Sequence, residues 1–199
     1  MCRVICVTAK PLCKGDFLAQ IAKILKSEIS NIILREKYLS EEEYLEFAKK
    51  VIEVCGRDKL IIHNFADTAK ALGVKKVHLP FTAFKELKNR ASFDVVGTSV
   101  HSVTDAVLAE KSGADYIIAG HIFETDCKKG IKGRGTEFLQ SVCDSVKIPV
   151  YAIGGINSDT AGRLKEVNSK SFCGVCVMSQ LMQSENPCDE VTKIIKGLR

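Results

Sequence analysis

The sequence predicts an α/β protein with one domain, a compact parallel (β/α)8 TIM barrel. Three observations support this fold. Eight short apolar runs rich in β-branched residues are spread along the chain, amphipathic stretches separate them, and 199 residues suit one domain better than two. Continuous apolar runs are typical of parallel strands that are buried on both faces. We therefore assign residues 1–199 to one barrel domain.

The candidate strands recur from one end of the chain to the other. They are Arg3–Thr8, Ser30–Arg35, Lys59–His63, Lys75–Leu79, Asp94–Ser99, Asp115–Gly120, Ile148–Ile153 and Phe172–Met178. The main competitor is an open doubly wound sheet. A dinucleotide-binding sheet of that kind has a Gly-x-Gly-x-x-Gly turn after its first strand, and the segment Ala9–Gly15 does not have this pattern.

Helix signals lie between the strands. Tyr44, Phe47, Ala48, Val51, Ile52 and Cys55 have the spacing of one helical stripe. Ser40 and Glu43 form a capping-box pattern before this stripe, and Gly56 follows it at a position where a left-handed residue is common. Asn186 and Pro187 similarly predict the start of a last helix.

Composition and charge narrow the class of protein. The net charge is +5, but the basic residues are scattered along the chain, which argues against nucleic-acid binding and is compatible with attraction of a small anion. No apolar run reaches the roughly 20 residues that span a bilayer, and residues 1–15 lack a signal-peptide pattern. We therefore expect a cytoplasmic protein without a membrane partner, whose nine cysteines are reduced.

Cys173 and Cys176 have the spacing of a redox or zinc motif. Both lie in the strand predicted over Phe172–Met178, and residues three apart on a strand point to opposite faces. We therefore expect both thiols to pack in the core, without a shared metal or a disulfide.

A phosphate site is predicted at the ends of the last two strands, because the active site of such barrels lies at the carboxyl ends of the strands. Gly154 and Gly155 follow the seventh candidate strand, and Met178 and Ser179 end the eighth. Glycines let backbone N–H groups approach an anion, and a helix N-terminus adds a positive dipole end. The alternative for the two glycines is a tight turn without a ligand.

The segment Gly120–Gly135 is a long polar loop that follows the sixth candidate strand. His121 stands directly at the strand end, where an imidazole can take and return a proton, so it is the predicted catalytic acid/base. Lys128 of the same loop is a predicted anion-binding residue. After the fifth strand, Ser99 and His101 are predicted substrate-binding residues, and His101 is a second acid/base candidate.

Arg35 and Lys37 flank the end of the second candidate strand. If the strand continues, both side chains point the same way and could bind a carboxylate or phosphate together. Alternatively, these residues form a structural ion pair with Glu36 or another neighbour, and the sequence favours neither interpretation.

Several of these segments together resemble the thiamine phosphate synthase/TenI family, most closely its TenI branch of thiazole tautomerases. The segments are Leu34–Lys37, Val77–Pro80, Gly97–Ser102, Gly120–Gly135, Ala152–Ile156 and Val177–Ser179. Synthases resemble this chain at the sixth strand end but have Gly-Pro-Ile-Phe there, where this chain has Gly120-His121-Ile122-Phe123. A histidine at this place is the proposed acid/base of the TenI branch, so the resemblance implies the same role for His121.

A second departure concerns magnesium. Synthases typically have an Asn-Asp-Arg run and a Gly-Gln-x-Asp run whose aspartates hold the metal, and this chain has His63-Asn64-Phe65 and Pro80-Phe81-Thr82-Ala83 instead. Magnesium prefers carboxylate and phosphate oxygens. We therefore expect no metal site and no cofactor, with magnesium needed only if synthase activity is retained.

The resemblance implies a thiazole tautomerase that aromatises a carboxythiazole phosphate in thiamine biosynthesis. One alternative is a thiamine-phosphate synthase, which joins hydroxymethylpyrimidine pyrophosphate to thiazole phosphate. A second alternative is a noncatalytic protein that binds thiazole phosphate or has a regulatory role, since a fold alone does not dictate function. The expected partner is a phosphorylated thiazole, and a homo-oligomer is plausible by analogy with the family.

Overall fold

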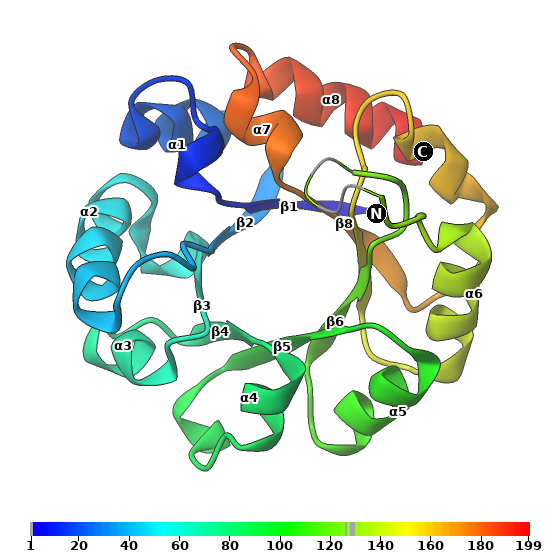
Figure 1. Ribbon diagram of the computed structural model, residues 1–199, viewed down its shortest axis with the longest axis horizontal. Helices are drawn as coiled ribbons and strands as arrows, with labels where there is room; N and C mark the ends of the chain where they lie inside the picture. Colours follow the sequence, from blue (N-terminus) through cyan, green and yellow to red (C-terminus); the bar gives the residue numbers. More distant parts are fainter. Residues whose placement is uncertain (1, 126, 128–129) are drawn as a thin grey trace.

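Eight parallel strands form one closed barrel surrounded by helices (Figure 1). The protein is described by a computed structural model in which residues 2–125, 127 and 130–199 are placed well enough to describe. The strands follow the chain order around the barrel, and β1 pairs with β8 to close it. The predicted (β/α)8 fold is confirmed.

The strand bounds agree with the candidate strands to within one or two residues at each end. The strands are β1 Arg3–Val7, β2 Ile29–Leu34, β3 Leu60–His63, β4 Lys76–Leu79, β5 Val95–Val100, β6 Tyr116–Gly120, β7 Val150–Ile153 and β8 Phe172–Val177. The α-helices are α1 Phe17–Leu25, α2 Glu41–Lys59, α3 Ala66–Ala71, α4 Phe81–Lys85, α5 Val103–Lys111, α6 Gly135–Ser145, α7 Ser179–Gln183 and α8 Pro187–Leu198. Short 3-10 helices include η1 Lys10–Leu12, η2 Arg90–Ser92 and η4 Ala161–Glu166.

Helix α2 begins where its capping signals predict. Ser40 Oγ accepts a hydrogen bond from the backbone N–H of Glu43, and the Glu43 carboxylate accepts one from the backbone N–H of Ser40. Gly56 has a positive φ of 70°, which interrupts the helical backbone before a last turn reaches Lys59. Tyr44, Ala48 and Val51 of the predicted stripe are buried against the barrel.

Two apolar layers hold the barrel together. A large outer core fills the space between the strands and the helices, and a small inner core fills the barrel itself. The inner core contains Ile5, Val7, Ile33, Ile61, Tyr116, Ile118, Tyr151 and Cys176. These side chains fill the interior of the barrel, and the active site of such barrels lies at the carboxyl ends of the strands.

The connection between β7 and β8 differs from a regular β-α unit. Only the 3-10 helix η4 covers this part of the barrel, and it packs beside α8. Strand β8 also departs from regular pairing with β7, because Val150 pairs with Phe172 while Tyr151 pairs with Gly174. The extra residue between those pairs is Cys173.

This irregularity corrects the prediction that Cys173 and Cys176 point to opposite faces of the strand. Cys173 and Cys176 both contact the inner core, although residues three apart on a regular strand face opposite sides. The bulge turns Cys173 inward. Both thiols are free, and packing in the core, which the sequence predicts for them, is what the structure has.

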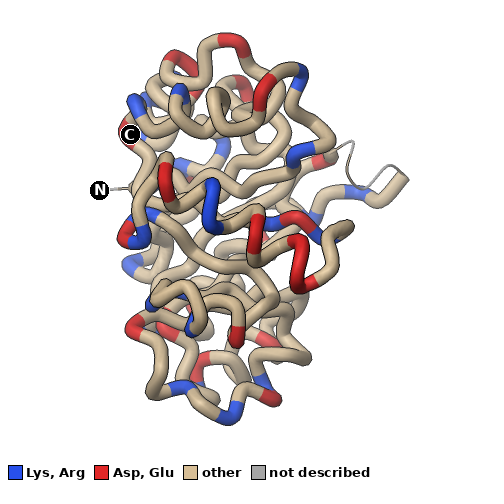
Figure 2. Tube along the Cα trace, turned by 90° about the vertical axis from the view of Figure 1, so that its left-hand side faces the viewer, with Lys and Arg blue, Asp and Glu red and all other residues tan. Residues whose placement is uncertain are grey.

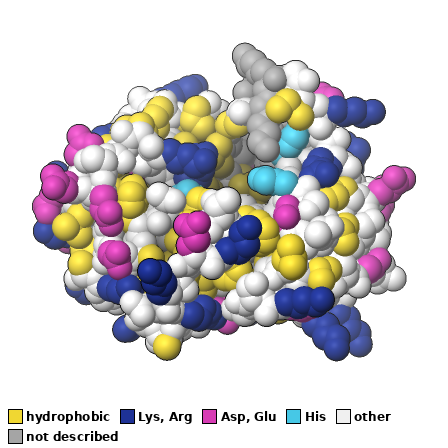
Figure 3. Space-filling view, turned by 60° about the horizontal axis from the view of Figure 1, so that its bottom comes forward, with side chains coloured by type: hydrophobic (Ala, Val, Ile, Leu, Met, Phe, Trp, Pro, Cys, Tyr) yellow, Lys and Arg dark blue, Asp and Glu magenta, His cyan; other side chains and the backbone are white. Residues whose placement is uncertain are grey.

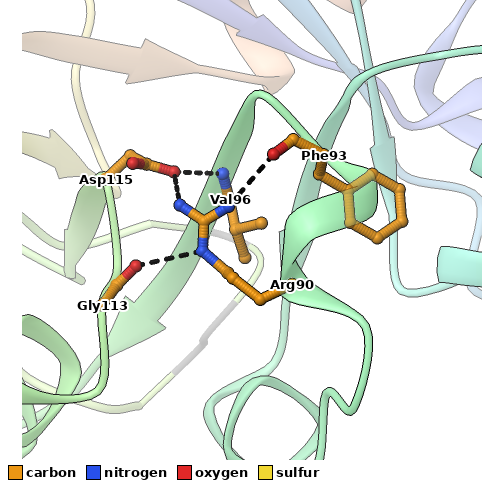
Figure 4. Close-up of polar contacts among 5 residues, drawn as sticks. All are labelled: Arg90, Phe93, Val96, Gly113 and Asp115. Carbon is orange, nitrogen blue, oxygen red and sulfur yellow. Dashed lines mark hydrogen bonds and ion pairs between the residues drawn. The ribbon is translucent and has the colours of Figure 1, made fainter.

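An arginine on the loop after α4 ties this loop to two strands (Figure 4). The guanidinium of Arg90 forms an ion pair with Asp115, and it also donates hydrogen bonds to the carbonyl oxygens of Gly113 and Phe93, each at 3.2 Å. The same Asp115 carboxylate accepts a hydrogen bond of 2.6 Å from the backbone N–H of Val96. The contacts join the beginnings of β5 and β6, opposite the open end of the barrel.

Charged side chains are spread over the surface. In the view of Figure 2, the positions of basic and acidic residues are interspersed along the Cα trace of the helices and loops. Among the described residues, no helix combines the length and the apolar composition needed to cross a membrane.

Candidate active site

A cavity of about 1300 Å³ opens at the carboxyl ends of the strands. Its lining includes every predicted site residue that the structure describes: Arg35, Lys37, Ser99, His101, His121, Gly154, Gly155, Met178 and Ser179. Lys128, the remaining predicted residue, lies outside the described part of the chain. Figure 3 shows histidine side chains close to basic side chains on one face of the molecule. The roles of these residues stay predictions.

His121 directly follows β6, and its buried ring forms part of the cavity wall. Its Nε2 lies 3.2 Å from the carbonyl oxygen of Ile131 in the β6–α6 loop. A carbonyl oxygen can only accept a hydrogen bond, so this contact requires the proton of a neutral imidazole to be on Nε2. The lone pair is then on Nδ1, which is the atom that can take a proton.

Gly154 and Gly155 lie against the segment that carries His121. Their φ angles are 101° and 65°, which L side chains rarely adopt. A Cβ on Gly154 would lie 2.4 Å from the Cβ of His121, and one on Gly155 would lie 2.3 Å from the carbonyl oxygen of Glu124. Close packing therefore explains both glycines without a ligand, and phosphate binding remains a prediction for this turn.

Arg35 and Lys37 both line the cavity, as the alternation along the end of β2 predicts, whereas Glu36 points elsewhere. The buried Glu36 carboxylate accepts hydrogen bonds from Thr8 Oγ1 at 2.5 Å and from the backbone N–H of Lys10 at 2.9 Å. None of the ion pairs among the described residues joins Arg35 to Glu36. Arg35 instead points its Nη1 at the sulfur of Met178, 4.0 Å away.

Burial shifts the pKa values of this pair. It raises the pKa of Glu36, although the hydrogen bonds from Thr8 and Lys10 oppose this. Burial lowers the pKa of Arg35, and the nearby Cys127 and Glu36 act in the opposite direction. A guanidinium remains charged at neutral pH, so Arg35 presents a positive charge to the cavity.

His63 and His78 also line the cavity, although the sequence predicts neither as a site residue. His63 is the last residue of β3 and His78 is the third of the four residues of β4, and their rings stack with centroids 6.0 Å apart. Burial lowers the pKa of both to about 3; the charges of Arg35 and Lys37 add to the effect on His63. Both rings are therefore neutral at pH 7. A histidine inside or at the end of a predicted buried strand could have identified them. Buried polar groups need a hydrogen-bond partner, so such a histidine indicates a polar contact inside the barrel.

The other predicted residues lie around the rim. His101 is exposed and its Nδ1 lies 3.0 Å from the carbonyl oxygen of Gly120, next to His121. Ser179 begins the short helix α7, and its Oγ lies 3.5 Å from the sulfur of Cys127. Cys127 therefore brings the β6–α6 loop close to the end of β8.

The residues of the cavity do not fit a magnesium ion. Asn64 and Ala83 stand where the resemblance places the metal-binding aspartates of synthases. Within the described ranges, no group of three or more His, Cys, Asp or Glu side chains could hold a metal. Since magnesium needs several oxygen ligands, carboxylates above all, the part of this cavity that the structure describes lacks the usual donor set.

Comparisons with known proteins agree with the resemblance at the level of the family. A family model described as thiamine monophosphate synthase matches residues 4–181. A thiamine-phosphate synthase from Fusobacterium nucleatum is 33% identical over 205 residues, which cover 98% of this chain and 97% of that protein. A thiamine-phosphate synthase from Clostridium tetani is 32% identical, with 96% and 94% covered. These names support the transferase alternative better than the tautomerase.

The solved structures give the same result for the fold. A thiamine phosphate pyrophosphorylase from Pyrococcus furiosus has a TM-score of 0.81 and 28% sequence identity, with 98% of this chain and 95% of that chain covered. The family model and the relatives each span most of the chain. This chain therefore belongs to the thiamine monophosphate synthase (TMP-TENI) family.

Proposed function

We propose that this protein is an isomerase that moves a proton on a phosphorylated thiazole and so converts a non-aromatic carboxythiazole phosphate to its aromatic tautomer. The observation that carries this proposal is the position of His121, whose ring is held in the cavity wall by its contact with Ile131. Proton transfer of this kind needs a positioned base and no metal, which suits a cavity whose described residues include no metal-binding group.

The proposed reaction follows from the state of the imidazole. Nδ1 of His121 takes a proton from the saturated ring carbon of the ylidene substrate, and the resulting imidazolium returns a proton to the exocyclic carbon of the ylidene double bond, which moves that double bond into the ring. The atoms of substrate and product are the same, and aromatisation favours the product. The turn at Gly154 and Gly155, with Met178 and Ser179, is assigned to the phosphate. Arg35 or Lys37 is assigned to the carboxylate, because a guanidinium or ammonium suits this group.

A second candidate is a thiamine-phosphate synthase, and two observations favour it. The relatives with the printed name thiamine-phosphate synthase are 32–33% identical over nearly the whole chain. The cavity of about 1300 Å³ also exceeds the roughly 300–1,000 Å³ of ordinary ligand pockets and leaves room for a second substrate. Against it stand Asn64 and Ala83 at the places of the metal-binding aspartates.

One pair of assays distinguishes the candidates. The pure protein is incubated with the non-aromatic thiazole tautomer in EDTA, and separately with pyrimidine pyrophosphate, thiazole phosphate and magnesium. Isomerisation changes the absorbance at constant mass and proceeds in EDTA, whereas synthesis releases pyrophosphate and gives a heavier product. Pyrophosphate release without isomerisation would replace our proposal by the synthase. Binding of thiazole phosphate without either reaction would replace it by a noncatalytic role.

A further inference from the structure

One layer inside the barrel holds a polar chain that the proposed reaction does not use. His63, His78, Gly97 and Tyr116 are paired in register across β3, β4, β5 and β6. Tyr116 belongs to the inner core and does not line the cavity, whereas Ser99, two residues beyond Gly97, does. The layer therefore forms part of the floor of the site, where His63 and His78 line the cavity and Tyr116 lies beneath them.

Gly97 makes room for the tyrosine in this layer. A Cβ at this position would lie 2.1 Å from the Tyr116 ring, closer than any real contact. Because Gly97 has no side chain, the phenol of Tyr116 reaches across β5 to His78 on β4. The Tyr116 Oη lies 3.0 Å from His78 Nδ1, and His78 Nε2 lies 2.8 Å from Ser99 Oγ. The three side chains form a continuous hydrogen-bonded chain from the inner core to the cavity.

The direction of the protons in this chain follows from burial. A buried hydroxyl without an acceptor is costly, and among the described residues the Tyr116 hydroxyl bonds to His78. Tyr116 therefore donates to Nδ1. Because burial lowers the pKa of His78 to about 3, the ring is neutral and has one N–H, which must then be on Nε2. This N–H donates to Ser99 Oγ, and the Ser99 proton is left for a ligand.

We infer that Tyr116, acting through His78, is a positioning residue that directs the hydroxyl proton of Ser99 into the cavity, where Ser99 donates a hydrogen bond to an acceptor atom of the ligand. The opposite arrangement would turn the Ser99 proton toward His78 and leave the Tyr116 proton without an acceptor. The inference rests on the proposed function for its ligand, since thiazole phosphate is the binding probe, but the proton positions belong to the free protein.

The first test observes the His78 ring in the whole chain labelled with ¹⁵N-histidine. NMR is expected to find the proton on Nε2 in the wild type. In Tyr116→Phe the two tautomers are expected to coexist, because the phenol that selects one of them is gone. Tyr151→Phe is the matched control: it removes another hydroxyl inside the barrel, from a ring 5.7 Å from Tyr116, and should leave the tautomer unchanged. The inference is overturned if the His78 proton of the wild type is on Nδ1, or if Tyr116→Phe has the same His78 tautomer as the wild type.

The second test measures the affinity for thiazole phosphate by calorimetry. Ser99→Ala is expected to weaken binding about fivefold to tenfold, the worth of one hydrogen bond. Ser99→Thr, which keeps the hydroxyl, should bind thiazole phosphate more tightly than Ser99→Ala. Tyr116→Phe should weaken binding at least about twofold, since only part of the protein then has the competent tautomer. In Tyr116→Phe, added thiazole phosphate should raise the fraction of His78 that has its proton on Nε2. A purely structural role of Tyr116 would not give this response.

The outcomes separate this inference from the proposed function. Equal affinity of wild type and Ser99→Ala overturns the donor role of Ser99. Failure of the wild type to bind thiazole phosphate overturns both the proposed ligand and the hydrogen bond from Ser99 to it. The tautomer of His78 in the free protein still tests whether Tyr116 sets the proton position. Melting temperatures of all variants identify any that lose affinity by unfolding.

Discussion

Gly154 lies so close to His121 that a Cβ on the glycine would be 2.4 Å from the Cβ of the histidine. This contact connects the turn after β7 with the proposed base after β6. Backbone hydrogen bonds strengthen the connection, because Ile122 N donates to Ile153 O and Phe123 N donates to Gly154 O. The position of the imidazole is therefore coupled to the backbone that is assigned to phosphate binding.

Gly154→Ala is expected to reduce isomerisation at least about tenfold, because the added methyl must displace the His121 backbone. Turnover and the melting temperature are measured together. Gly113→Ala is the matched control: Gly113 also has a positive φ, 83°, but no atom lies within 4 Å of a Cβ there. The free energy of unfolding of the control should fall only by the roughly 1–2 kcal/mol that an alanine in the left-handed conformation costs, and its turnover should be unchanged. Equal turnover of the two variants would contradict the coupling.

His121→Asn should lower isomerisation by about 10²–10⁴-fold, the usual contribution of a general base, and leave the affinity for thiazole phosphate within about twofold. Rapid kinetics with the non-aromatic tautomer and calorimetry with the product give the two values. His101→Asn is measured beside it, because His101 is the second acid/base candidate at this rim and contacts the adjacent Gly120 carbonyl. If His101→Asn is the inactive variant, the base has been assigned to the wrong ring.

Asp115→Asn is expected to lower the free energy of unfolding by about 1–3 kcal/mol, measured by urea denaturation. The change removes the charge that Arg90 pairs with and weakens the acceptor for Val96 N–H. Glu46→Gln breaks an exposed ion pair with Lys49 and should change stability by less than about 0.5 kcal/mol. Similar effects of both substitutions would mean that the Arg90 contacts contribute no more than an ordinary surface pair.

Acid should destabilise the protein through His63. Its pKa is about 3 in the folded state, against 6.5 for the ordinary side chain, chiefly because it is buried. Below about pH 6.5 the unfolded chain therefore binds a proton that the folded chain does not, and stability is lost as the pH falls. Compared with His63→Asn, the wild type should lose about 2 kcal/mol more between about pH 6.5 and about pH 4.5. Parallel stability curves for the two proteins would contradict this shift.

The fold and much of the cavity lining were predictable from the sequence for identifiable reasons. Apolar runs mark the buried strands, and the carboxyl ends of parallel strands meet at one end of a barrel. This rule alone brings His121, Gly154 and Ser179 together. Alternation along a strand end correctly separated Arg35 and Lys37 from Glu36.

Contacts that depend on register could not be read from the sequence. Tyr116 is 38 residues from His78 along the chain, and they meet because strands β4, β5 and β6 align at one level with a glycine between them. The bulge at Cys173 was only partly predictable, since Gly174 inside the strand permits a bulge but does not show which residue β7 skips. One extra residue reverses the direction of a side chain, so an inference from strict alternation fails.

The pairing of β1 with β8 makes completion of the binding site a late event in folding. Residues Arg3–Cys6 must find Gly174–Val177, the partners most distant from each other in the strand order. Bringing together segments so far apart costs more chain entropy than any hairpin, and contacts of high sequence separation form slowly. On a ribosome, the cavity can assemble only after the eighth strand has emerged, so a chain that stops short of it leaves β1 with an unsatisfied edge.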